Sequence, residues 1–140
     1  MIEAAEGDDF PAVCGLLENC GLTTADVGPG QGTYYLAKGK TLLGVAALEH
    51  FGKAALLRSF VVAPAARKAG VGRSLLEHVL GESRRAGFSH VYLLTDTAEE
   101  YYARYGFSAI DRSQIPVEVL TLSAMGSTCP ATCAAMALTL

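Results

Sequence analysis

The stretch of sequence that decides the fold is residues 54–87, which reads AALLRSFVVAPAARKAGVGRSLLEHVLGESRRAG. Its first part, Ala54–Val62, is a long, largely apolar run rich in strand-forming residues and predicts a β-strand. From Val71 onward apolar residues recur at helical spacing and leave charged residues for the opposite face, which predicts an amphipathic helix closing at Ala86-Gly87. A basic turn with two glycines joins them. We therefore expect a fold built around a strand–turn–helix unit.

Upstream of this unit the sequence predicts one helix and two strands. The helix begins at Asp8-Asp9-Phe10-Pro11, where an acidic cap precedes a proline, and it ends at Gly21. The strands are Thr33–Ala37 and Thr41–Glu49, each followed by a turn. With Ala54–Val62 they form an antiparallel meander.

Downstream of the unit, strands and a helix alternate. The expected elements are a buried strand His90–Thr95, a short helix from Thr97 to Gly106, a strand from Phe107 to Ile110, a loop from Asp111 to Pro130 and a last strand ending at Leu140. Thr97 and Glu100 form the capping box of the short helix. This order and the chain length predict a single α/β (α+β) domain over residues 1–140.

Composition narrows the class of protein. The chain is 51% hydrophobic and 18% charged, as soluble globular proteins are, and its net charge of -3 argues against binding to a nucleic-acid backbone. No apolar run approaches the about 18 residues of a membrane span. The start Met1-Ile2-Glu3 is acidic, whereas a secretory signal begins with basic residues. We therefore expect a cytoplasmic protein without nucleic-acid or membrane partners.

Cysteines are expected to be free thiols in a reducing cytosol. Cys14 lies in an apolar helical pattern and is interpreted as core filler. Cys129 and Cys133 are four residues apart, but without CxxC spacing or a matching histidine pair they do not predict a zinc site. No metal is expected.

The turn after the long strand carries the clearest chemical signal. Arg67–Gly72 follows the pattern R-x-x-G-x-G immediately before a helix, which places unobstructed backbone N–H groups at the positive end of the helix dipole. Such a row suits a pyrophosphate, and neighbouring basic side chains add positive charge. The alternative is a tight turn with a solvated basic rim. The glycine spacing fits neither a dinucleotide-binding fingerprint nor a P-loop.

Residues 42–110 resemble the Gcn5-related N-acetyltransferase (GNAT) superfamily in element order and in two motifs, this turn and Tyr101–Phe107. The resemblance implies a mixed, mostly antiparallel sheet flanked by helices, with acetyl-coenzyme A as co-substrate. The strand before the turn would pair with the pantetheine arm, and the turn would hold the pyrophosphate. The implied cofactor-binding residues are Phe60, Val61, Val62, Arg67, Lys68, Ala69, Gly70, Val71, Gly72, Arg73 and Ser74.

Acetyl transfer to an amine needs a base for an ammonium proton and an acid for the coenzyme thiolate. The resemblance implies that Tyr102 is the acid, and a phenol with a pKa near 10 can protonate a thiolate of similar basicity. Packing is the alternative for one of the motif's tyrosines. Glu49 is the tentative base; a solvated strand end, or a water chain serving as base, are the alternatives. His78 and His90 are interpreted as structural.

Arg58 interrupts an otherwise apolar strand, so it needs a partner if it is buried. One hypothesis is that its guanidinium binds an acidic group of the acceptor substrate. The alternatives are an internal ion pair and an outward-facing side chain. The hypothesis predicts that Arg58→Ala raises KM for the acceptor and leaves the affinity for acetyl-coenzyme A unchanged.

Four segments narrow the resemblance further, to the acetyltransferases of arsenic-resistance operons: Leu56–Pro64, Tyr92–Thr95, Ile110–Arg112 and Cys129–Ala131. It implies an amino-acid-like acceptor, including an arsenic-containing glutamate analogue. Cys129 and Cys133 are candidates for binding trivalent arsenic, with inert thiols as the alternative.

The sequence thus predicts an N-acetyltransferase that moves the acetyl group directly to a small-molecule amine. A non-catalytic acyl-coenzyme A or arsenical sensor, or an enzyme acting on a peptide or polyamine amine, are the alternatives. A last strand at the sheet edge would favour a homodimer.

Overall fold

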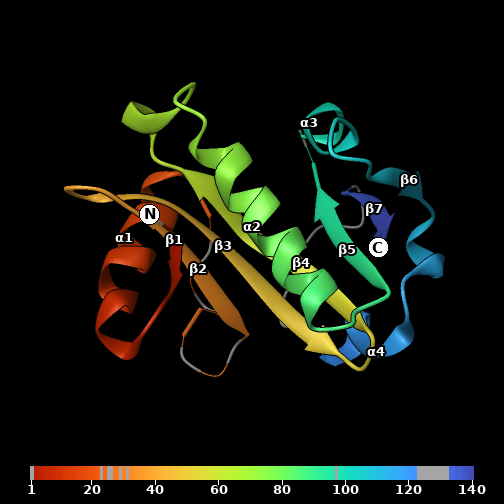
Figure 1. Ribbon diagram of the computed structural model, residues 1–140. Helices are drawn as coiled ribbons and strands as arrows, with labels where there is room; N and C mark the ends of the chain where they lie inside the picture. The colour runs from red at the N-terminus through yellow and green to blue at the C-terminus, as the bar shows by residue number, and fades with distance from the viewer. Residues whose placement is uncertain are drawn as a thin grey trace. The chain divides into compact units, whose positions relative to one another are not determined.

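The computed structural model describes residues 2–22, 24, 27, 28, 30, 32–96, 98–122 and 133–140 (Figure 1). The strands in this part of the chain are β1 (Ile2–Ala4), β2 (Thr33–Lys38), β3 (Leu42–Phe51), β4 (Ala54–Val62), β5 (His90–Thr95), β6 (Ser108–Ile110) and β7 (Ala134–Thr139). The helices are α1 (Phe10–Asn19), α2 (Val71–Arg85), α3 (Glu99–Ala103) and α4 (Val117–Leu122), with 3-10 turns η1 (Gly7–Asp9), η2 (Pro64–Ala66) and η3 (Arg112–Gln114).

The described strands form one seven-stranded sheet in the order β1-β2-β3-β4-β5-β7-β6. The pairs β1/β2, β2/β3, β5/β7 and β6/β7 are antiparallel. β4 and β5 are parallel, and Ala54–Leu56 pairs with His90–Tyr92. A parallel neighbour needs a crossover connection, which α2 provides. The predicted α/β fold with a mixed, mostly antiparallel sheet is confirmed.

The described chain divides into two compact units, one of residues 1–48 and 59–82, the other of residues 49–58 and 83–140. β3, β4 and α2 each run through both. In the first unit, apolar residues of α1 pack against alternate residues of three strands, namely Val13, Leu17, Tyr34, Leu36, Val45, Ala47 and Val61. The period of two along β2 and β3 supplies this buried face.

The second unit has its own core, formed by Ala54, Leu56, Tyr92, Leu94, Ile115, Val119, Cys133 and Ala135. Ala54 and Leu56 alternate along β4, and Tyr92 and Leu94 along β5, so each strand contributes one face. In the described part of the chain no helix has the length and apolar character needed to cross a membrane.

The strands β4 and β5 have the predicted bounds, whereas other elements differ. The meander strands extend to Lys38 and Phe51. α1 ends at Asn19 and α3 at Ala103, earlier than predicted. The acidic start of α1 forms η1, in which Glu6 and Asp9 make a capping box. Thr97, the predicted cap of α3, lies outside the described residues.

The predicted loop from Asp111 is wrong over its first half, because η3 and α4 lie there. Ile115 and Val119 are buried in the second core, and this tertiary burial orders a segment whose local pattern is weak. β1 was not predicted, since three residues are too few to show a period.

The edge position expected for the last strand is also wrong. β7 lies between β5 and β6, and the two edges of the sheet are β1 and β6. Because β7 is hydrogen-bonded on both sides, it offers no open edge for a second copy of the chain. The reason for expecting a homodimer is thereby removed.

Candidate functional site

The predicted coenzyme-binding segment Arg67–Ser74 comprises the turn before α2 and the first residues of α2. It lies wholly in the first unit. Lys68 and Gly70 both have left-handed backbone, with φ of 70° and 82°. Turns that contain left-handed residues point successive N–H groups into a common concavity. The N–H of Ser74 donates to the carbonyl of Gly70 (3.0 Å), and in an α-helix the N–H groups before this first bond have no acceptor within the helix.

Gly70 satisfies the backbone conformation of the turn. A Cβ at this position would meet no atom within 4 Å, so space does not require glycine there. The left-handed φ of Gly70 favours glycine, because residues with a side chain adopt this conformation infrequently. The open space above Gly70 fits the approach of an anion to the N–H groups. This donor set is the one that a diphosphate needs.

Two of the three basic side chains expected at the turn are engaged with protein groups. Arg67 Nε donates to the carbonyl of Val62 (3.2 Å) and its Nη2 contacts Cys20 Sγ (3.8 Å). Arg73 Nε donates to Glu77 Oε1 (2.8 Å) in an exposed ion pair one helical turn away. Exposed pairs of this kind contribute about 0.3–0.5 kcal/mol, so a phosphate can compete for Arg73.

Ser59, in β4, has an unusual backbone conformation just before the segment expected to meet the pantetheine arm. Its φ is 51°, a left-handed value inside a strand. Residues with a side chain adopt this conformation infrequently, and it interrupts the regular extended backbone. Phe60, Val61 and Val62 follow Ser59, and Ala63 N–H donates to the carbonyl of Leu43 in β3 (2.7 Å). The sequence contained no signal for this conformation.

Glu49 and Arg58 form an ion pair in the second unit. Both residues are buried, with exposed fractions of 8% and 3%. The sequence left an internal ion pair open for Arg58, and this is the arrangement found. For Glu49 a solvated strand end was the alternative to a base, and burial excludes it. A base role for Glu49 would have to be carried by a buried carboxylate that is paired with a guanidinium.

The hairpin register contains the signal that could have paired these residues. A two-residue turn at Gly52-Lys53 sets Phe51 opposite Ala54, and counting in steps of two places Glu49 and Arg58 on one face of the sheet.

Tyr102 lies on α3 in the second unit, among other aromatic rings. Its ring centroid is 5.4 Å from that of Tyr101 and 5.8 Å from that of Phe107, both in edge-to-face geometry. Burial raises the pKa of Tyr102 to about 12. Burial and a hydrogen bond to Tyr105 also raise the pKa of Tyr101. At neutral pH the phenol of Tyr102 is therefore protonated, as a proton donor must be.

The remaining candidates have structural surroundings. His78 packs edge-on against Tyr35 (5.3 Å between centroids) and lies 3.9 Å from Glu82, while His90 stacks on Tyr92 (5.9 Å). Cys14 and Cys20 are partly buried and Cys133 is buried in the second core. Cys129 lies outside the described residues. Among those that are described, no three histidine, cysteine or acidic side chains gather as a metal site would require.

Comparison with known proteins shows which family the sequence matches. A family model described as an acetyltransferase (GNAT) domain matches residues 30–109. The amino-acid acetyltransferase of Neisseria meningitidis serogroup A is 31% identical over 77 residues, which are 54% of this chain and 18% of that protein. The serogroup B protein matches equally. The chain thus spans less than a fifth of the length of these curated relatives.

Solved structures share the fold. N-acetylglutamate synthase from Neisseria gonorrhoeae, complexed with coenzyme A and N-acetyl-glutamate, has a TM-score of 0.80 at 21% identity, covering 100% of this chain and 35% of that one. A Mycobacterium tuberculosis protein in complex with CoA gives 0.77 at 20%, covering 100% and 99%. The ribosomal-protein-S18-alanine N-acetyltransferase from Escherichia coli gives 0.71 at 20%, covering 99% and 92%.

Proposed function

Because the chain belongs to the GNAT acetyltransferase family, we propose that it transfers the acetyl group of acetyl-coenzyme A to the amine of a small, amino-acid-like acceptor. The superfamily expected from the sequence is confirmed, and membership in it supports the acyltransferase class. The observation that carries the proposal is the turn of Lys68 and Gly70 ahead of the 15-residue helix α2. Its N–H groups and basic side chains suit the diphosphate of coenzyme A.

The proposed reaction is a direct transfer. The acceptor amine attacks the thioester carbonyl carbon, a backbone N–H near Val62 polarises the carbonyl oxygen, and the carbon–sulfur bond breaks. A base first takes one proton from the acceptor's ammonium, so that the free amine can attack. The phenol of Tyr102 donates its proton to the leaving thiolate and is reprotonated by the second proton that the nitrogen loses as the amide forms. Glu49 remains the tentative base among the side chains, and a chain of water molecules is the alternative.

The acceptor class is supported by Arg58. Arg58 is buried and forms an ion pair with Glu49, so an acceptor carboxylate would share the guanidinium with that partner. The planar geometry of the guanidinium suits the carboxylate of an amino acid. The names of the similar proteins agree with this choice, since they include an amino-acid acetyltransferase and an N-acetylglutamate synthase.

The narrower proposal, an arsenic-containing glutamate analogue as acceptor, rests on the sequence resemblance alone. The same holds for trivalent arsenic at Cys129 and Cys133, of which only Cys133 is described, as a buried core residue. The cytoplasmic location, the single domain over residues 1–140 and the absence of nucleic-acid and membrane partners stay predictions.

The test is consumption of acetyl-coenzyme A across a panel of amines, followed by mass detection because protein thiols would react with a thiol dye. The panel contains glutamate, phosphinothricin, arsinothricin, a polyamine and a peptide with a free N-terminus. Turnover on the glutamate analogues supports the proposal. Turnover on the peptide or polyamine alone removes the acceptor class, and binding of acetyl-coenzyme A without any turnover favours the sensor.

A further inference from the structure

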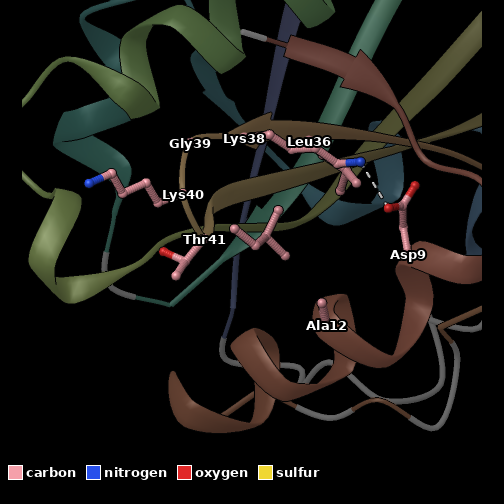
Figure 2. A pocket seen from close by; sticks show the side chains of 8 residues that line it. Asp9, Ala12, Leu36, Lys38, Gly39, Lys40 and Thr41 are labelled. Atoms are coloured by element: carbon pink, nitrogen blue, oxygen red, sulfur yellow. Dashed lines mark hydrogen bonds and ion pairs between the residues drawn. The ribbon is translucent and has the colours of Figure 1, made fainter.

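The β2–β3 hairpin carries two lysines whose surroundings differ. Lys38 Nζ lies 2.8 Å from Glu3 Oε1 and 2.9 Å from Asp9 Oδ1. Hydrogen bonds to these carboxylates raise the pKa of Lys38, so its ammonium stays charged and is paired within the protein. Lys40 is exposed and has no hydrogen-bond or ion-pair partner within the described ranges. Lys38 and Lys40 both line the cavity beside the hairpin, and Figure 2 shows Lys38 directed toward Asp9 and the Lys40 side chain extending away from Asp9.

The start of β3 lies against the turn that precedes α2. Leu43 accepts the hydrogen bond from Ala63, the first residue after β4. A Cβ on Gly44 would lie only 3.2 Å from Val71 Cγ1, in the first turn of α2. Lys40 is three residues before Leu43, so their Cα atoms are at most about 11 Å apart. The flexible four-carbon side chain of Lys40 extends its reach beyond the Cα position, in a region where the neighbouring residues Leu43 and Gly44 meet Ala63 and Val71.

The other basic side chains near the turn are already committed. Arg67 is bonded to Val62 and contacts Cys20, and Arg73 is paired with Glu77. Lys68, like Lys40, is exposed and without a partner in the described chain. Lys40 and Lys68 are therefore the basic side chains of this region that are exposed and have no hydrogen-bond or ion-pair partner in the described part of the chain.

We propose that Lys40 binds a phosphate group of coenzyme A, as a second lysine beside Lys68. The inference rests on the proposed function, since it assumes that the turn binds this coenzyme. Coenzyme A carries two phosphate sources, the diphosphate and the ribose 3′-phosphate, and an ammonium binds either as a point charge. The contact is solvent-exposed, so added salt weakens it.

The test compares Lys40→Ala with Lys53→Ala, which removes an equally exposed lysine from the turn of the β3–β4 hairpin. Isothermal titration measures the Kd for coenzyme A and for dephospho-coenzyme A, at 20 and 300 mM KCl. We expect Lys40→Ala to weaken coenzyme A binding about three- to tenfold at low salt and less at high salt. Lys40→Arg retains the charge and should stay within about twofold of the unaltered chain.

The dephospho-coenzyme identifies the phosphate. A loss that disappears with dephospho-coenzyme A places Lys40 at the 3′-phosphate, and a loss that persists places it at the diphosphate. Equal affinities of Lys40→Ala and the unaltered chain, or the same loss in Lys53→Ala, overturn the inference and leave the proposed function standing. If the unaltered chain binds no coenzyme A, the proposed function fails and the inference with it.

Discussion

At the scale of single residues, the Glu49–Arg58 pair is where stability and function are hardest to separate. Each partner is buried, so each depends on the other for the solvation that water would otherwise give. Loss of activity in Arg58→Ala would follow from a lost acceptor contact or from a damaged fold. A variant set that removes both charges together distinguishes these causes.

We predict that Glu49→Gln lowers the free energy of unfolding by about 3–5 kcal/mol, because it leaves a buried guanidinium without its counter-ion. The double variant Glu49→Leu with Arg58→Met should regain most of this loss, since it leaves no buried charge. Urea unfolding followed by circular dichroism measures both. A double variant as unstable as Glu49→Gln would refute the pair as the source of the effect.

The same double variant tests the acceptor contact. If Arg58 binds the acceptor, this variant folds and binds acetyl-coenzyme A normally but raises KM for the acceptor or loses turnover. Normal kinetics in a folded double variant would exclude Arg58 from substrate binding and Glu49 from the role of base.

Tyr102→Phe should lower kcat by about a hundredfold or more and leave the Kd of coenzyme A unchanged, because it removes a donor proton and keeps the ring. The retained ring still packs against Tyr101 and Phe107. Tyr105→Phe, on a neighbouring tyrosine, is the control and should keep kcat within a few-fold. An unchanged kcat in Tyr102→Phe would remove this residue from the mechanism.

The contribution of Tyr102 to the free energy of unfolding should decrease at high pH. Burial raises its pKa to about 12, so at pH 10 the folded protein keeps the proton that the unfolded chain begins to lose. Its contribution to stability is therefore complete below pH 10 and is lost as the pH rises toward 12. Stability in Tyr102→Phe should fall less over this range than in the unaltered chain, measured by urea midpoints at pH 9, 10 and 11.

At the scale of elements, Gly44 sets how closely β3 approaches α2. A Cβ there would lie 2.8 Å from Leu75 Cδ1 and 3.0 Å from the carbonyl oxygen of Val61. We predict that Gly44→Ala lowers the free energy of unfolding by about 1–3 kcal/mol and weakens coenzyme A binding, since the first turn of α2 must move. Gly15→Ala, in open space on α1, is the control and should stabilise by about 0.5–1 kcal/mol. Urea unfolding measures the stability of both variants, and titration with coenzyme A measures their affinity. Equal stability and affinity of the two variants would contradict the close packing at Gly44.

The elements that could be predicted from the sequence are those marked by a clear local pattern of apolar and turn residues. β4 and β5 are apolar runs bounded by turn residues, so their bounds could be given from sequence. α4 could not, because Ile115 and Val119 are ordered by packing against strands distant in the chain. The position of β7 in the sheet depends on pairing partners, which the period of an apolar segment does not specify.

The candidate site divides in the same way. The turn of Arg67–Ser74 is contiguous, and its motif could be recognised from sequence. The left-handed backbone of Ser59 and the two contacts of Arg67 could not be recognised, because they depend on backbone conformation and on Cys20, at the end of α1, lying near Arg67. The acid role of Tyr102 stays a prediction from the motif, since its aromatic surroundings are equally those of a packed ring.

At the scale of the whole molecule, the two compact units have separate cores but share secondary structure. β3, β4 and α2 each run through both units, so neither unit can unfold without breaking elements that the other needs. We therefore predict a single cooperative unfolding transition, as expected of one domain over residues 1–140.

Two core variants test this prediction, one in each unit. Val13 and Val91 are both fully buried, and Val→Ala at either should cost about 1.5–3 kcal/mol. Each variant should shift the whole urea transition, with the same midpoint by far-ultraviolet circular dichroism and by tyrosine fluorescence, and with an unchanged slope. Four of the six tyrosines, Tyr92, Tyr101, Tyr102 and Tyr105, lie in the second unit, so the fluorescence reports mainly on it. The long helix α2 contributes to the dichroism mainly from the first unit. Two separated midpoints, or a variant that shifts only one of the two signals, would mean that the units unfold independently and that the chain holds two domains.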